Sequence, residues 1–157
     1  MSGALDDIVV LDLTRNFASS MSAAFLADFG ARVIRLETLG EADTAPRTAD
    51  SPRPGAWNHE ADLIHRNKQS VCIDVHGERG REVLDDIAAL CDVILTDWPL
   101  AELEAVGLDY ASASARRADI IVARISGFGP RGKDRDLPPI DELAAARTGM
   151  MPIVQQP

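Results

Sequence analysis

The chain has 157 residues, of which 46% are hydrophobic and 26% charged, so it can bury a core and has the composition of a globular protein. Its formal net charge of −9 argues against a nucleic-acid backbone or an anionic membrane as the main partner, because both repel an acidic surface. No basic segment followed by an apolar one opens the chain, and no apolar run approaches the roughly twenty residues of a membrane span. A cytoplasmic location is the default expectation.

The only two cysteines, Cys72 and Cys91, lie at apolar positions of expected elements. This placement favours buried thiols over a disulfide or a metal ligand. We therefore expect no metal site.

The first expected elements form a strand–helix–strand unit. Ile8–Leu13 is apolar apart from Asp12, which predicts a strand buried on both faces. After a polar loop over residues 14–20, residues 21–30 are rich in Ala, Leu and Met and predict a helix, with Gly30 at its cap. Arg32–Glu37 is a second strand. Such a unit implies a parallel sheet, whose ligands bind outside the carboxyl ends of the strands.

The remaining pattern continues this alternation. Apolar strand patterns and helical spacings follow each other, and Gly107 can end one of the short helices. The order indicates an α/β, Rossmann-like doubly wound, mostly parallel sheet of about five or six strands. The expected strands are 70–75, 92–96 and 119–125, and the expected helices are 78–90, 99–106, 110–117 and 140–147.

Two long loops interrupt these elements, over residues 38–61 and 126–139. Both are longer than most connections in compact domains, and loops of that length are usually functional or packed against a partner. Residues 14–20 contain no Gly-x-Gly-x-x-Gly, so a nicotinamide dinucleotide is not expected. Residues 149–157 are apolar and uncapped, and we expect the chain to stop inside a larger fold.

Six short phrases, in the same order and at matching spacing, resemble the class III CoA-transferases. That family includes formyl-CoA transferase, carnitine CoA-transferase and α-methylacyl-CoA racemase. The phrases are Val10–Thr14, Leu26–Glu37, Arg66–Asp74, Asp92–Ile94 with Gly107–Tyr110, Ile125–Gly129 and Asp141–Gly149.

The resemblance implies that residues 1–157 are the N-terminal part of an incomplete large domain that binds coenzyme A. It implies CoA or acyl-CoA as the partner, and a homo-oligomer or a second CoA-transferase-like domain. The aspartate that carries the acyl group in the transferases lies beyond the segment matching Asp141–Gly149, so no catalytic residue is expected here. A non-catalytic half acting as a structural or dimerisation module is the alternative.

The resemblance also implies a set of CoA-binding positions and several departures from the family pattern. In formyl-CoA transferase, basic residues stand where this chain has Thr38, His76, Ala105 and Pro138. In the racemases a histidine stands at the position of Ile140. Losing these cations would weaken CoA binding, which motivates the alternative above. The expected cofactor-binding residues are Phe17, Ala18, Ile73, Asp74, Val75, His76 and Asp141.

Several of these polar residues also have a purely structural interpretation. His76 either contacts CoA or is an exposed turn histidine. Asp141 is either an acid/base partner, as in racemase-like members, or an acid favoured at a helix N-terminus. Arg66 and Lys68 either serve a phosphate or lie solvated on the surface. The same holds for the cations within residues 131–135, which interleaved aspartates partly cancel.

Overall fold

The computed structural model describes residues 3–38, 59–135, 137 and 139–151. The chain divides into two compact units, Met1–Arg124 and Ile125–Pro157. Each unit is described by itself.

The first unit is built on one parallel sheet. In the part of the chain that the structure describes, the strand order is β3-β2-β1-β4-β5, and every neighbouring pair runs parallel. The central strand β1 pairs on both sides, with Val10 opposite Val33 of β2 and Val93 of β4. This confirms the predicted α/β doubly wound class. The strands are β1 (Val9–Leu13), β2 (Arg32–Thr38), β3 (Lys68–Ile73), β4 (Val93–Thr96) and β5 (Ile121–Arg124).

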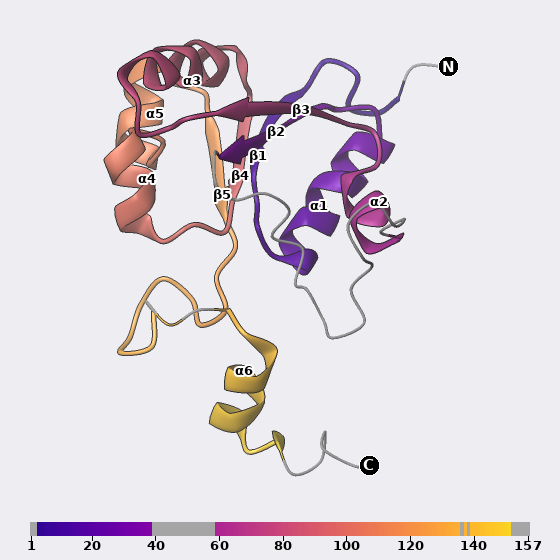
Figure 1. The fold of residues 1–157 in the computed structure, drawn as a ribbon, viewed down its shortest axis with the longest axis vertical. Helices are drawn as coiled ribbons and strands as arrows, with labels where there is room; N and C mark the ends of the chain where they lie inside the picture. The colour runs from indigo at the N-terminus through magenta and orange to yellow at the C-terminus, as the bar shows by residue number, and fades with distance from the viewer. Residues whose placement is uncertain (1–2, 39–58, 136, 138, 152–157) are drawn as a thin grey trace. The chain divides into compact units, whose positions relative to one another are not determined.

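Helices cover both faces of this sheet (Figure 1). Successive side chains of a strand point to opposite faces, and β1 shows the consequence. Val10 packs with the small residues Ala23 and Ala27 of α1, whereas Leu11 packs in a larger core with residues of the helices on the other face. The helices of the unit are α1 (Phe17–Asp28), α2 (His59–His65), α3 (Glu78–Leu90), α4 (Leu100–Val106) and α5 (Tyr110–Arg116).

Two helices differ from the sequence prediction. Helix α1 begins at Phe17, so the expected loop over residues 14–20 is wrong in its second half. Buried Ser19 and Ser20 lie in the first turn of α1 and carry no apolar signal that could mark it as helix. Helix α2 begins at His59, inside the expected loop 38–61. Most of that loop, residues 39–58, lies outside the described residues.

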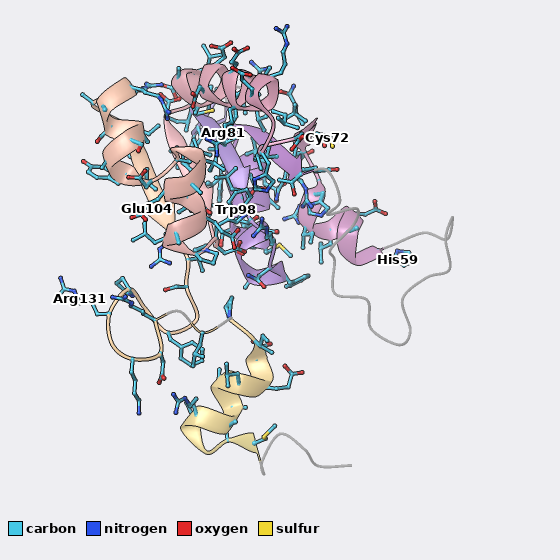
Figure 2. All side chains as sticks on the ribbon, turned by 60° about the vertical axis from the view of Figure 1, so that its left-hand side comes forward. His59, Cys72, Arg81, Trp98, Glu104 and Arg131 are labelled. Carbon is cyan, nitrogen blue, oxygen red and sulfur yellow. The ribbon has the colours of Figure 1, made fainter. Side chains whose placement is uncertain are left out.

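The edge strand β3 differs from the sequence prediction in its bounds and in the exposure of Cys72. It begins at Lys68, paired with Val33, and ends at Ile73, so Asp74 and Val75 lie beyond the strand. As an edge strand it has one neighbour and is less covered than a central strand. Cys72, labelled in Figure 2, is therefore exposed, contrary to the expected buried thiol. Cys91 is buried as predicted. Both cysteines are free thiols.

Other boundaries match closely. Helix α3 spans the predicted 78–90, and Gly107 ends α4 in the left-handed conformation, with φ of 71°. None of the helices within the described ranges is long and apolar enough to cross a membrane.

Gly80 lets the start of α3 approach the chain that leaves β3. A Cβ atom built at Gly80 would lie 1.9 Å from the backbone oxygen of Asp74, too close for any real contact. We expect Gly80→Ala to destabilise the protein by about 1–3 kcal/mol, because the backbone at Asp74 must move. Urea unfolding measures this.

The matched control is Gly77→Ala. Its nearest neighbour would be a carboxylate oxygen of Asp74 at 3.0 Å, at the end of a side chain that can rotate away. Equal losses for the two variants would contradict the close approach at Gly80.

The second unit contains one helix in its described residues, α6 (Asp141–Thr148). Asp141 and Glu142 lie in its first turn, where the helix dipole stabilises acidic side chains. Gly149 ends the helix with φ of 74°. The described residues of the preceding loop, 126–135, 137 and 139, form no helix or strand. Arg147 of α6 forms an ion pair with Asp134 of that loop.

Candidate functional site

The turn between β1 and α1 is held by a carboxylate from the next strand. Asp97 follows β4, and its oxygens accept hydrogen bonds from the backbone N–H of Arg15 at 2.9 Å and of Asn16 at 2.8 Å. The side chains of Asn16 and Ser19 also donate to Asp97. A carboxylate at the N-terminus of a helix is favoured by the helix dipole. Asp97 thereby fixes the backbone position of Arg15 in the β1–α1 turn.

Beneath this turn lies a buried ion pair. The Lys68 ammonium is 2.7 Å from Asp12 Oδ2, and the two side chains are 2% and 0% exposed. Lys68 also donates to the backbone oxygen of Ser20, and the Thr14 hydroxyl donates to Asp12 at 2.6 Å. Burial lowers the pKa of Lys68, while the Asp12 carboxylate opposes that shift. The sequence offered two interpretations of Lys68, a phosphate contact or a solvated surface residue. The buried ion pair agrees with neither.

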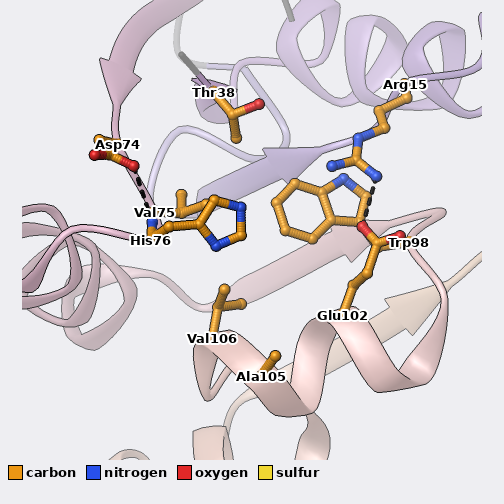
Figure 3. Close-up of a pocket in the computed structure, with 9 residues that line it drawn as sticks. All are labelled: Arg15, Thr38, Asp74, Val75, His76, Trp98, Glu102, Ala105 and Val106. Carbon is orange, nitrogen blue, oxygen red and sulfur yellow. Dashed lines mark hydrogen bonds and ion pairs between the residues drawn. The ribbon is translucent and has the colours of Figure 1, made fainter. Parts of the chain in front are cut away.

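A pocket of about 320 Å³ opens beside the carboxyl ends of the strands (Figure 3). Its walls come from the β1–α1 turn, the end of β2, the turn after β3, the segment after β4, and helix α4. In an open parallel sheet, ligands bind outside the carboxyl ends of the strands, so the pocket lies where the fold predicts a site. The lining residues are Arg15, Thr38, Asp74, Val75, His76, Trp98, Glu102, Ala105 and Val106.

One wall of the pocket is formed by an arginine side chain that stacks on an aromatic ring. Trp98 is 3% exposed, and the Arg15 guanidinium carbon lies 4.0 Å from the centroid of its ring. Arg15 Nη1 is 2.7 Å from Glu102 Oε2 of α4. The Trp98 indole nitrogen is buried and has no hydrogen-bond partner among the described residues. A buried N–H donor without an acceptor lowers the stability of the fold.

The facing wall is the turn after β3. Asp74 Oδ1 accepts a hydrogen bond from the backbone N–H of His76 at 3.1 Å, and the Gly77 N–H donates to the Asp74 backbone oxygen. This closes a tight turn in which the Asp74 side chain takes part. In Figure 3 the His76 ring is directed toward the Trp98 indole across the pocket.

Three of the residues predicted from the sequence come together here. Asp74, Val75 and His76 line the pocket, and Ile73 lies just before them, buried in the larger core. The structure also brings Thr38 and Ala105, two positions that the resemblance marked, to the same pocket.

Other predicted residues lie elsewhere. Phe17 and Ala18 are exposed in the first turn of α1 and are not among the residues that line the pocket. Asp141 lies in the second unit, in the first turn of α6, and Pro138 lies outside the described residues. The prediction that Phe17, Ala18 and Asp141 bind a cofactor stays a prediction.

Sequence reasoning missed Arg15, Trp98 and Glu102. Trp98 could have been noticed, because an aromatic side chain follows directly after a predicted strand at the binding edge of a parallel sheet. Arg15 and Glu102 are 87 residues apart, and nothing in the sequence pairs them. Within the described ranges, no group of three or more His, Cys, Asp or Glu side chains could hold a metal ion.

Comparison with known proteins identifies the family. The model of CoA-transferase family III matches residues 5–157. The chain belongs to CoA-transferase family III. It is 32% identical over 140 residues to cinnamoyl-CoA:phenyllactate CoA-transferase of Clostridium sporogenes, covering 87% of this chain and 34% of that protein. It is 32% identical over 149 residues to succinyl-CoA:glutarate CoA-transferase of Homo sapiens, covering 95% of this chain and 34% of that protein.

Solved structures agree with this assignment. A crystal structure of Rv3272 from Mycobacterium tuberculosis matches with a TM-score of 0.80 at 30% identity, over 95% of this chain and 40% of that one. A CaiB/BaiF family protein from Brucella suis matches with a TM-score of 0.80 at 29% identity, over 96% and 40%. The chain therefore spans about a third of the length of the curated relatives that it matches.

Proposed function

We propose that this chain is the CoA-binding N-terminal portion of a CoA-transferase or acyl-CoA racemase relative, and that its pocket receives part of CoA. One observation carries the proposal. Thr38, His76 and Ala105 come from three separate elements, yet they line one pocket. The resemblance implies that basic residues stand at these three positions in formyl-CoA transferase.

The proposed parent reaction moves CoA between carboxylic acids through an acyl-aspartate. The aspartate lies outside these 157 residues, so the chain contributes binding and positioning rather than the nucleophile. The Asp97 contacts support such a role, because they fix Arg15 at the pocket wall. We propose a homo-oligomer, or a second CoA-transferase-like domain, as the partner that completes the site.

The pocket volume limits what can enter. Sites for drug-sized ligands occupy about 300–1,000 Å³, and this pocket of about 320 Å³ stands at the low end. It therefore suits one end of CoA rather than the whole molecule. The flat Trp98 and His76 side chains favour the adenine ring as that end, since bases stack on aromatic faces.

Calorimetric titration of CoA tests the proposal on the 157-residue chain. We expect micromolar binding, and a loss of affinity of at least about tenfold in Ala105→Trp, whose indole would occupy the pocket. Ala101→Trp is the matched control, because Ala101 is exposed on the same helix and does not line the pocket. Equal affinity in both variants would place CoA elsewhere.

The alternative is a structural or dimerisation module that has lost CoA binding. The presence of Thr38, His76 and Ala105 instead of basic residues favours it. No heat at millimolar CoA, from a chain whose circular dichroism shows an intact fold, would support this alternative and reject the proposal.

A further inference from the structure

The charges around the pocket are unusual for a site that takes a phosphorylated ligand. Among the described lining residues, Arg15 is opposed by two carboxylates, Asp74 and Glu102. Arg15 is also engaged twice already, because its guanidinium stacks on Trp98 and pairs with Glu102 at 2.7 Å. A phosphate entering this pocket would compete with Glu102 for Arg15 and would be repelled by the Glu102 charge.

The uncharged features of the pocket indicate what it does accept. Trp98 lines the pocket with the small part of its indole that is exposed. Val75 and Val106 add apolar surface. A flat, neutral ring matches these groups, and a phosphate dianion does not.

We propose that Glu102 is a specificity-determining residue, which pairs with Arg15 and so makes the pocket indifferent to the 3′-phosphate of CoA. This inference rests on the proposed function, because it assigns a preference to the same pocket. The pocket then accepts dephospho-CoA at least as well as CoA. The two ligands differ only in the 3′-phosphate. The ratio of their dissociation constants therefore measures how much the 3′-phosphate contributes to binding.

The decisive variant is Glu102→Gln, which keeps the side-chain shape and removes the charge. This removes one competitor for Arg15 and the repulsion between Glu102 and a phosphate, and a charge-assisted contact of a phosphate with Arg15 is worth about tenfold in affinity. The matched control is Glu104→Gln on the same helix, labelled in Figure 2. Glu104 is exposed and does not line the pocket, so this variant makes the same change of net charge away from the site.

The experiment titrates CoA and dephospho-CoA, at low and at raised salt, into the unmodified chain and both variants. For the unmodified chain we expect dephospho-CoA to bind at least as tightly as CoA. In Glu102→Gln we expect CoA to bind about tenfold tighter and dephospho-CoA to change less than about twofold. Salt should remove the gain, and Glu104→Gln should show none.

Two results would overturn the inference while leaving CoA binding intact. One is a preference of the unmodified chain for CoA over dephospho-CoA of about tenfold or more. The other is a gain in Glu102→Gln that is equal for both ligands or is matched by Glu104→Gln. If neither ligand binds the unmodified chain at millimolar concentration, the proposed function itself fails and the inference falls with it.

Discussion

Replacing Lys68 with methionine is expected to lower the free energy of unfolding by about 3–5 kcal/mol, because it leaves the Asp12 carboxylate buried without its cation. Asp12 is 0% exposed, and the Lys68 ammonium at 2.7 Å is the charge that opposes it. Methionine keeps much of the lysine stem and removes the charge and the donors. Urea unfolding at neutral pH, followed by circular dichroism, measures the loss.

Two further variants separate the missing charge from simple loss of contact. Arg66 and Asp28 form a partly exposed pair at 2.6 Å, with side chains 29% and 32% exposed, and Arg66→Met should cost clearly less than Lys68→Met because solvent screens the charges. In Lys68→Met combined with Asp12→Asn, the carboxylate charge is gone and the amide oxygen can still accept from Thr14. This double variant should regain a large part of the loss. A double variant that is no more stable than Lys68→Met would contradict the explanation.

The same pair shows where sequence reasoning stops. Asp12 lies in a predicted buried strand, whereas Lys68 was expected just before a strand and is the first residue of β3. The two residues are 56 positions apart in the chain. Their contact requires that β3 pairs with β2, so that β2 lies between β3 and β1. Local pattern carries periodicity and caps but not which charge meets which. Lys68 therefore looked like a surface cation.

Helices with a strong local signal were predicted well, and those without it were not. Helix α3 has apolar side chains at helical spacing and matches its predicted bounds, and Gly107 marks the end of α4 by a conformation that glycine favours. The first turn of α1 has Ser19 and Ser20 instead. The Asn16 N–H and the Ser19 hydroxyl donate to Asp97, about 80 residues later in the chain, and no local pattern could reveal these contacts.

One wall of the candidate site could be predicted from the sequence, and the opposite wall could not. The strand order places the turns after β2, β3 and β4 at one edge of the sheet, and this much follows from the βαβ pattern. It directs attention to Asp74, Val75 and His76, which line the pocket. The opposite wall depends on α4 packing back toward the β1–α1 turn, so Glu102 meets Arg15 over Trp98 only in the folded chain.

Asp97 links this wall to the stability of the sheet, and its removal gives the second large expected effect. Asp97→Ala should cost about 2–4 kcal/mol, since the N–H groups of Arg15 and Asn16 and the buried hydroxyl of Ser19 would lose their acceptor together. Asp97→Asn keeps one acceptor oxygen and should cost clearly less. Urea unfolding compares the two variants with Asp7→Ala, an exposed aspartate that should change stability by less than about 0.5 kcal/mol.

A small carboxylate in solution can test the physical reason for the loss. Asp97→Ala leaves the backbone N–H donors of Arg15 and Asn16 directed at the space that the side-chain carboxylate occupied. Sodium acetate should therefore stabilise Asp97→Ala more than sodium chloride does at equal ionic strength, whereas the two salts should act alike on the unmodified chain. CoA affinity should fall in the same variant, because Arg15 follows the turn that Asp97 holds. If Asp97→Ala is as stable as Asp7→Ala, the carboxylate does not organise the β1–α1 turn, and the position of Arg15 at the pocket needs another cause.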